Sequence, residues 1–215
     1  MAVQPDNWIK APSTNSSDHT DEGVIIDIGT GDGRFVYHSA RQNPNKFYIG
    51  IDPNARPLEK ISEKIHRKPA KGGAPNVLFI QSAVEDLPAE LDAIAAEVFV
   101  QFPWGSLLRG VAGGDETVLG NLRRLCLPKA RLHITMGLDH QRDRHEWERL
   151  ELARISREYV GAVLAGRYRN AGFRIIGELS SPDEVEIRTS WDKRLRRNSS
   201  RSLFRILAEA EEPVQ

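Results

Sequence analysis

Long hydrophobic runs and cysteine are what this 215-residue sequence lacks most clearly. No apolar stretch approaches the roughly 18 residues that a membrane-spanning helix needs, and the polar residues 1–23 contain no signal-peptide core. The single cysteine, Cys126, excludes a disulfide framework and a multi-cysteine metal site. We therefore expect a protein that stays in the reducing cytoplasm, does not associate with a membrane and holds no metal.

Net charge is also lacking, because 30 acidic residues balance 30 basic ones. A neutral protein is not an obvious partner for a polyanion, but the charges of this chain are unevenly spread. Residues 56–71 carry a net charge of +4 and residues 188–205 carry +6, which leaves −10 for the remainder. Two solvated surfaces would explain this pattern, yet the concentration of positive charge favours a polyanionic partner.

Hydrophobic residues form 40% of the chain, which is enough to build the core of one α/β domain. From residue 24 onward, short apolar runs alternate with segments of helical periodicity, a pattern typical of βαβ units around a parallel sheet. Strands are predicted at 24–28, 46–51, 76–80, 96–102, 130–136, 173–179 and 202–209. Helices are predicted at 34–42, 55–67, 115–125 and 144–170, the last with an interruption near Gly161 or Gly166.

These elements predict a Rossmann-like α/β fold with a seven-stranded, mostly parallel sheet. The last two strands are expected to form an antiparallel hairpin joined by a long basic connection. Residues 24–210 are expected to form a single domain. Residues 1–23 are rich in polar residues and proline, so they are expected to form a flexible arm.

The segment VIIDIGTGDG, residues 24–33, ends a predicted strand with an aspartate and then places glycines at every second position. In a doubly wound sheet the ligand lies beyond the carboxyl ends of the strands, next to this turn. The spacing differs from the G-x-G-x-x-G pattern that seats a pyrophosphate on a helix N-terminus. Asp27 with Gly29, Gly31 and Gly33 instead suits S-adenosylmethionine, whose cationic amine can donate to a carboxylate. A dinucleotide-dependent enzyme is the alternative.

Two further acidic residues fit a nucleoside at the same edge of the sheet. Asp52 ends the second predicted strand, where a carboxylate can accept hydrogen bonds from both ribose hydroxyls. Glu85 follows the third predicted strand, from where methyltransferase folds contact the adenine end of the cofactor. A helix cap or a surface charge is the alternative explanation for each acid.

Aromatic residues are few, at 7% of the chain, but two tryptophans occupy informative positions. Pro103 and Trp104 follow the fourth predicted strand, at the carboxyl edge where a methyl acceptor would lie. Trp191 lies in the basic connection before the last strand, which in this fold passes over the substrate pocket. Two indole faces could clamp a flipped base, since each stacked base contributes about 1–3 kcal/mol. A core position is the alternative for Trp104, and Trp8 and Trp147 are interpreted as packing residues.

The two basic runs can flank such a pocket. Apolar residues of the predicted helix 55–67 recur on one face, while its cations point to the opposite face. These cations and those around Trp191 would meet RNA phosphates from two sides without reading the bases. The predicted phosphate-binding residues are Lys60, Lys64, Arg67, Lys68, Lys71, Lys193, Arg194, Arg196, Arg197 and Arg201.

Several of these segments together carry a resemblance to a known family. They are IDIGTGDGR, FYIGIDP, KISEKIHRKPAKGG, AVEDLP, FPWGSLLRGV and TSWDKRL with the later RSLFR, in order and at compatible spacing over roughly residues 24–136 and 171–207. The chain resembles the 16S rRNA (adenine-N(1))-methyltransferases of the aminoglycoside-resistance Kam/Npm type. The resemblance implies a class I S-adenosylmethionine-dependent methyltransferase fold. It also implies methylation of adenine 1408 in helix 44 of 16S rRNA, within the 30S subunit, and hence aminoglycoside resistance.

The resemblance also implies roles for individual residues. The implied cofactor site comprises Asp27, Gly29, Asp52, Glu85, Ser106 and Thr189, with Gly31, Gly33 and Pro103 beside them. Trp104 and Trp191 would hold the flipped adenine, and the phosphate contacts would come from Lys64, Arg67, Lys68, Lys71, Arg194 and Arg201. No general base is assigned, because ring nitrogen N(1) already carries a lone pair and the sulfonium is an activated methyl donor. The product would be S-adenosyl-L-homocysteine, and the protein is expected to act as a monomer.

Two segments depart from the family pattern. The family usually begins with a short β-hairpin that helps it dock on the ribosome, whereas residues 1–23 lack a strand pattern. Residues 140–161 are strongly charged and match the family poorly. On sequence alone, two other functions stay open: a methyltransferase that acts on another RNA or on a small molecule, and a non-catalytic RNA-binding module that keeps the cofactor fold.

Overall fold

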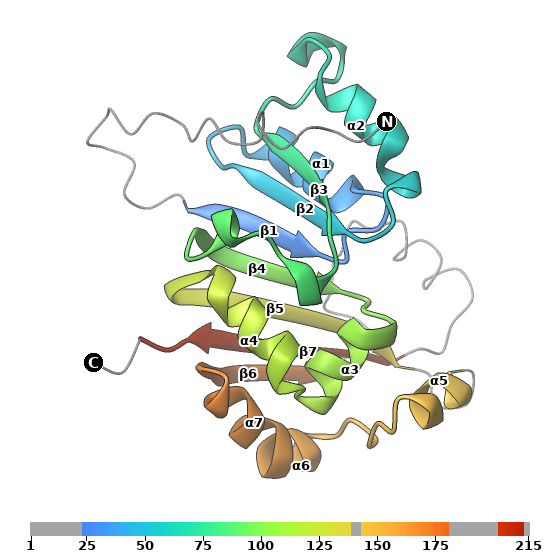
Figure 1. Ribbon diagram of the computed structural model, residues 1–215, viewed down its shortest axis with the longest axis vertical. Helices are drawn as coiled ribbons and strands as arrows, with labels where there is room; N and C mark the ends of the chain where they lie inside the picture. Colours follow the sequence, from blue (N-terminus) through green and yellow to red (C-terminus); the bar gives the residue numbers. More distant parts are fainter. Residues whose placement is uncertain (1–22, 139–142, 181–201, 213–215) are drawn as a thin grey trace.

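The computed structural model describes residues 23–138, 143–180 and 202–212, which form a seven-stranded sheet with helices on both faces (Figure 1). The strand order is β3 (Val77–Gln81), β2 (Tyr48–Asp52), β1 (Val24–Ile28), β4 (Ala95–Gln101), β5 (Cys126–Leu138), β7 (Ser202–Ala210) and β6 (Phe173–Ser180). Strands β1 to β5 are parallel, and β7 is antiparallel to both of its neighbours, β5 and β6. The predicted fold class, including the C-terminal antiparallel pair, is confirmed.

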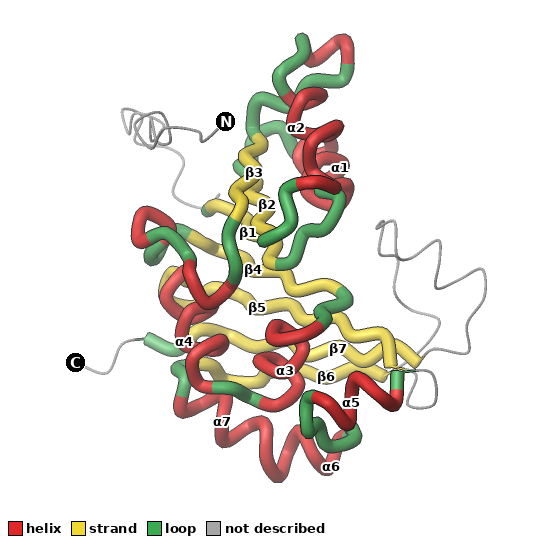
Figure 2. Tube along the Cα trace, turned by 45° about the vertical axis from the view of Figure 1, so that its right-hand side comes forward, coloured by secondary structure: helices red, strands yellow, loops and turns green. Residues whose placement is uncertain are grey.

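The helices lie between the strands in chain order. They are α1 (Arg34–Gln42), α2 (Glu59–Ile65), α3 (Gly105–Gly113), α4 (Glu116–Leu125), α5 (Arg144–Arg149), α6 (Arg157–Tyr159) and α7 (Ala165–Asn170). Figures 1 and 2 show α3 and α4 on one face of the sheet and α1 on the other. In the part of the chain that the structure describes, no helix has the length and apolarity to cross a membrane.

Side chains alternate along β1 and so divide the core into two layers. Ile26 and Ile28 point into the larger hydrophobic cluster, to which α3, α4 and α7 contribute. Ile25 points to the opposite face, into a smaller cluster that includes Tyr37 of α1. Asp27 has the same parity as Ile25, so its side chain lies on the α1 face of the sheet, near the carboxyl end of the strand.

The central position of β1 determines which loops meet. Asp27 is in register with Gly50 of β2 on one side and with Phe99 of β4 on the other. Asp52, at the end of β2, is in register with Gln81 at the end of β3. Because these strands are parallel, the loops that follow them gather at one edge of the sheet, where ligands bind in folds of this type.

One helix that was not predicted lies directly after β4. The segment Gly105–Gly113 contains three glycines, which are poor helix formers, so its sequence favours a loop. It is nevertheless helical because Leu108, Val111 and Ala112 are buried in the larger cluster. Tertiary packing therefore overrides local propensity in α3.

The prediction of one helix over 144–170, interrupted near Gly161 or Gly166, was wrong. Helix α5 ends at Arg149, and Glu151, two residues later, adopts a left-handed φ of 52°. The next helix, α6, begins at Arg157 and is capped by Ser156, whose side chain accepts a hydrogen bond from the backbone N–H of Tyr159. Gly161, the predicted interruption, lies within a π-helical segment, Val160–Leu164, that continues into α7.

The basic segment after β2 is tied to α1 by Tyr37. The Tyr37 hydroxyl donates to the carbonyl oxygen of Gly72 at 2.8 Å, and the Lys64 ammonium lies 4.4 Å from the centre of the Tyr37 ring. The next residue, Gly73, packs so closely on the chain that an added Cβ would lie 1.7 Å from the carbonyl oxygen of Arg67. The loop that carries the cations is therefore compact and fixed against α1.

Replacing Gly73 by alanine is expected to lower the free energy of unfolding by about 1–3 kcal/mol, because the loop must shift to make room for the methyl group. The matched control is Gly120→Ala in α4, where an added Cβ meets no atom within 4 Å. That control should stabilise the protein by about 0.5–1 kcal/mol, since alanine is the better helix former. Denaturant unfolding measures both variants, and an unchanged midpoint for Gly73→Ala would contradict the close approach.

Candidate functional site

The glycine loop after β1 has the backbone conformation that its sequence requires. Gly29, Gly31 and Gly33 have φ angles of 74°, 60° and 68°, a region in which residues with a Cβ are strained. An added Cβ at Gly31 would meet nothing within 4 Å, so this part of the loop faces open space. A ligand can therefore approach the backbone closely at the carboxyl edge of the sheet.

Asp27, just before this loop, is almost completely buried, with 2% of its surface exposed. Its Oδ1 accepts a 3.4 Å hydrogen bond from the Gln101 side chain at the end of β4, and no described residue forms an ion pair with it. Burial raises the pKa of Asp27 to about 7, and repulsion from Asp52 adds to this rise. The carboxyl group is thus poised to ionise next to a cationic group.

Asp52 holds the glycine loop in place. Its two carboxylate oxygens accept hydrogen bonds from the backbone N–H groups of Gly31, at 2.8 Å, and of Asn54, at 2.9 Å. A carboxylate has about four acceptor positions, so capacity is left for ribose hydroxyls. Glu85 is exposed on a 3₁₀ turn, Val84–Asp86, after β3, at the same edge of the sheet.

The turn between β4 and α3 lies against the glycine loop. An added Cβ at Gly29 would come within 2.9 Å of the Leu107 side chain, in the first turn of α3. Pro103 is buried, whereas Trp104 exposes 56% of its surface and Ser106 is also exposed. The core position considered for Trp104 is excluded, and its exposed indole lies in the turn that leads into the helix contacting the glycine loop.

The cations of the first basic run, residues 56–71, lie in the segment between β2 and β3. Lys60, Arg67, Lys68 and Lys71 are exposed, while Lys64 is half-buried over Tyr37. The other predicted site residues lie outside the described part of the chain. They are Thr189 for the cofactor, Trp191 for the adenine, and Lys193, Arg194, Arg196, Arg197 and Arg201 for the RNA phosphates. Trp147 is buried in the core, as expected for a packing residue.

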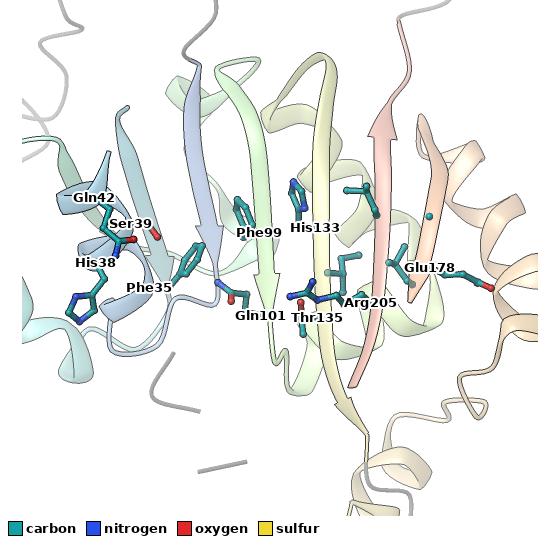
Figure 3. A pocket seen from close by; sticks show the side chains of 14 residues that line it. Phe35, His38, Ser39, Gln42, Phe99, Gln101, His133, Thr135, Glu178 and Arg205 are labelled. Atoms are coloured by element: carbon teal, nitrogen blue, oxygen red, sulfur yellow. The ribbon is translucent and has the colours of Figure 1, made fainter. Parts of the chain in front are cut away.

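A cavity of about 730 Å³ lies on the α1 face of the sheet rather than at its carboxyl edge. Figure 3 shows Phe35 of α1, Phe99 and Gln101 of β4, His133 of β5 and Arg205 of β7 around it. Asp52, Glu85 and Trp104 do not line this cavity. Two of its lining residues adjoin Asp27: Gln101 donates a hydrogen bond to the carboxylate, and Phe99 is in register with Asp27 on the neighbouring strand.

Sequence reasoning missed two polar residues that support the site. Gln101 contacts Asp27 because β4 is the neighbour of β1, and its position at the end of a strand was a usable signal. Glu146 of α5 accepts a hydrogen bond from the backbone N–H of Gly105, 41 residues earlier in the chain. No local pattern indicates that second contact.

Comparison with known proteins places these features in a family. The family model described as "NpmA: 16S rRNA (adenine(1408)-N(1))-methyltransferase" matches residues 9–210. A protein of Streptoalloteichus hindustanus named 16S rRNA (adenine(1408)-N(1))-methyltransferase is 38% identical over 192 residues, which cover 86% of this chain and 85% of that protein.

Solved structures agree with this similarity. The aminoglycoside resistance methyltransferase NpmB1 is 47% identical, with a TM-score of 0.77 and 87% of each chain covered. A variant of the 16S rRNA (adenine(1408)-N(1))-methyltransferase from Catenulisporales acidiphilia, solved with its cosubstrate SAM, is 34% identical with a TM-score of 0.82. That comparison covers 90% of this chain and 88% of the other. The match of the family model to nearly the whole sequence, together with these relatives, shows that the chain belongs to the NpmA family of 16S rRNA (adenine(1408)-N(1))-methyltransferases.

Proposed function

We propose that this chain transfers a methyl group from S-adenosylmethionine to N(1) of adenine 1408 in 16S rRNA. The substrate is the 30S subunit, where the target lies in helix 44, and the modification gives aminoglycoside resistance. The enzyme works as a cytoplasmic monomer. The observation that carries the proposal is the exposed Trp104, in a turn whose following helix contacts the glycine loop, together with an aspartate that is buried and has no ion pair among the described residues.

The residues at the carboxyl edge of the sheet fit S-adenosylmethionine. Asp27 is buried without an ion pair among the described residues, so it suits the cationic amine of the cofactor. Open space over Gly31 lets the ligand reach the backbone, and Asp52 has acceptor capacity for the ribose. Gly29, Gly33, Glu85, Pro103, Ser106 and Thr189 complete the proposed cofactor site.

For methyl transfer to adenine N(1), the main task of the protein is to position the two reactants. S-adenosylmethionine would supply the methyl group of its sulfonium: the lone pair of adenine N(1) would form a bond to the methyl carbon as the carbon–sulfur bond breaks, and S-adenosyl-L-homocysteine would leave with that electron pair. Trp104 and Trp191 stack on the two faces of the flipped adenine and hold N(1) in line with the methyl group. Since no proton has to leave N(1), neither tryptophan needs to act as a base.

The basic residues position the enzyme on the rRNA. Lys60, Arg67, Lys68 and Lys71 are exposed on a compact segment at one end of the sheet, where they can contact phosphates. Lys64 and the cations of the connection between β6 and β7, namely Lys193, Arg194, Arg196, Arg197 and Arg201, are proposed to extend this surface. Binding through phosphates depends on the shape of the RNA and weakens steeply with salt.

Methylation of 30S subunits is the direct test of the proposed function. Purified protein with S-adenosylmethionine is expected to produce a reverse-transcription stop at position 1408, because methylated N(1) cannot pair. A host that expresses the protein should become resistant to kanamycin and apramycin. Unmodified 30S after long incubation would reject the proposal, and methylation that is insensitive to salt would favour a small-molecule substrate. Cofactor binding without methylation of any RNA would favour a non-catalytic module.

Removing either indole should stop methylation without affecting cofactor binding. Trp104→Ala and Trp191→Ala are each expected to lower the rate by about 10- to 100-fold or more, because one stacking face of the base is lost. The Kd for S-adenosylmethionine should stay within about twofold. Trp104→Phe is the matched control, since it keeps an aromatic face. Full activity of either alanine variant would remove the clamp from the mechanism.

The affinity for S-adenosylmethionine should depend on the ionisation of Asp27. The pKa of this carboxyl is raised to about 7, so it is mostly neutral at pH 6 and mostly ionised at pH 8. Only the ionised form attracts the cationic amine, so the Kd should fall about tenfold between these pH values. Calorimetric titration with S-adenosylmethionine at both pH values, for the wild type and for Asp27→Asn, separates the contribution of Asp27 from that of other ionising groups. The same pH profile in both proteins would show that Asp27 is not the group responsible.

A further inference from the structure

The turn that presents Trp104 contains one backbone conformation, that of Phe102, that needs external support. Phe102 and Gly105, on either side of Pro103 and Trp104, have positive φ angles of 51° and 59°. The Phe102 N–H donates to the carbonyl oxygen of Thr135 on β5 at 2.7 Å, which fixes the first half of the turn. A positive φ at a residue such as phenylalanine is strained and persists only where its surroundings hold it.

The second half of the turn is the start of α3, and its own sequence offers no cap. Trp104 occupies the N-cap position, and an indole has no oxygen to accept from the first free N–H groups of the helix. Glu146 of α5 takes that role from a distant part of the chain. Its Oε1 accepts a 3.2 Å hydrogen bond from the Gly105 N–H, at the positive end of the α3 dipole.

Glu146 is itself held firmly. Only 9% of its surface is exposed, and Arg149 donates to both carboxylate oxygens, at 2.7 and 2.8 Å. The same guanidinium keeps the pKa of Glu146 below its ordinary value, so the carboxylate is ionised and acts as an acceptor. A paired, buried carboxylate aimed at a backbone N–H defines the position of Gly105 more strictly than a solvent contact would.

The helix that carries Glu146 is anchored in the core. Trp147 and Leu150 belong to the larger hydrophobic cluster, together with Leu108 of α3. Just beyond α5, the Leu152 side chain would lie 3.2 Å from an added Cβ at Gly113, at the other end of α3. Residues 144–152 therefore contact α3 at both ends and connect its position to the core.

We propose that Glu146 is a positioning residue for base methylation, which fixes the turn of Trp104 by accepting the hydrogen bond from the Gly105 N–H. This inference rests on the proposed function, since it assigns Trp104 to the methyl acceptor. Glu146 does not touch the reacting atoms. It acts by keeping the indole in one orientation next to the glycine loop, and small errors of placement cost large factors in rate.

Two conservative variants of Glu146 distinguish the effect of side-chain length, which decides whether an oxygen can reach the Gly105 N–H, from the effect of negative charge. Glu146→Gln keeps an oxygen at the same distance but loses the charge, whereas Glu146→Asp keeps the charge on a side chain too short to reach Gly105. If the hydrogen bond to Gly105 is what matters, the glutamine variant should keep kcat within about threefold of the wild type, and the aspartate variant should lose about tenfold or more. In both, the Kd for S-adenosylmethionine and the KM for 30S subunits should change less than about twofold.

The matched control is Glu148→Ala on the same helix. Glu148 is exposed and pairs only with Arg144 among the described residues, so the control should keep full activity. Hydrogen–deuterium exchange of the segment that contains Gly105 gives a readout independent of catalysis. Its amide should exchange faster in Glu146→Asp than in the wild type or in Glu146→Gln.

The outcomes separate this inference from the proposed function. If the wild type leaves 30S subunits unmodified, the proposed function fails, while the exchange measurement still tests the support of Gly105. If the wild type methylates adenine 1408 but both variants keep kcat, Glu146 has no positioning role. A loss of kcat in Glu146→Gln with retention in Glu146→Asp would also overturn the proposal, because charge rather than reach would then control the turn.

Discussion

Parallel pairing of β1 with both β2 and β4 is the constraint on which the site depends. It places Asp27 between Gly50 and Phe99 in register, so the glycine loop, Asp52 and the turn of Trp104 end at one edge of the sheet. Each loop is then fixed by a specific contact: Asp52 binds the glycine loop, and Leu107 of α3 packs against Gly29. The proposed nucleoside and acceptor positions are adjacent because the strands that lead to them are paired.

The strands and the conformation of the loop after β1 could be predicted from the sequence because both rest on local signals. Hydrophobic runs that end in Asp27 and Asp52 define strand ends, and left-handed glycines define the turn. Helix α3 could not be predicted, since its glycines argue against a helix and only burial of Leu108 and its neighbours makes it form. The contact between Glu146 and Gly105 was equally hidden, because it joins residues 41 positions apart without any sequence motif.

The segment between β5 and β6 shows why a poor match to family motifs does not mean a minor structural role. Residues 140–161 are strongly charged and match the family motifs poorly, yet α5 within them carries the buried Glu146, paired with the exposed Arg149, and the core residue Trp147. The constraint on this segment is geometric: one acceptor must reach Gly105 and a few apolar side chains must fill the core. Many different sequences can satisfy such a requirement, so a single sequence contains no motif from which it could be recognised.

The position of β7 has a consequence for how the protein is made. This strand lies between β5 and β6, and in the described part of the chain β6 pairs with β7 alone, so that pairing must wait until residues 202–210 are available. During synthesis the most recent residues are still enclosed by the ribosome that makes them. β6 can therefore join the sheet only after β7, which follows it by more than 20 residues, has also emerged from the ribosome.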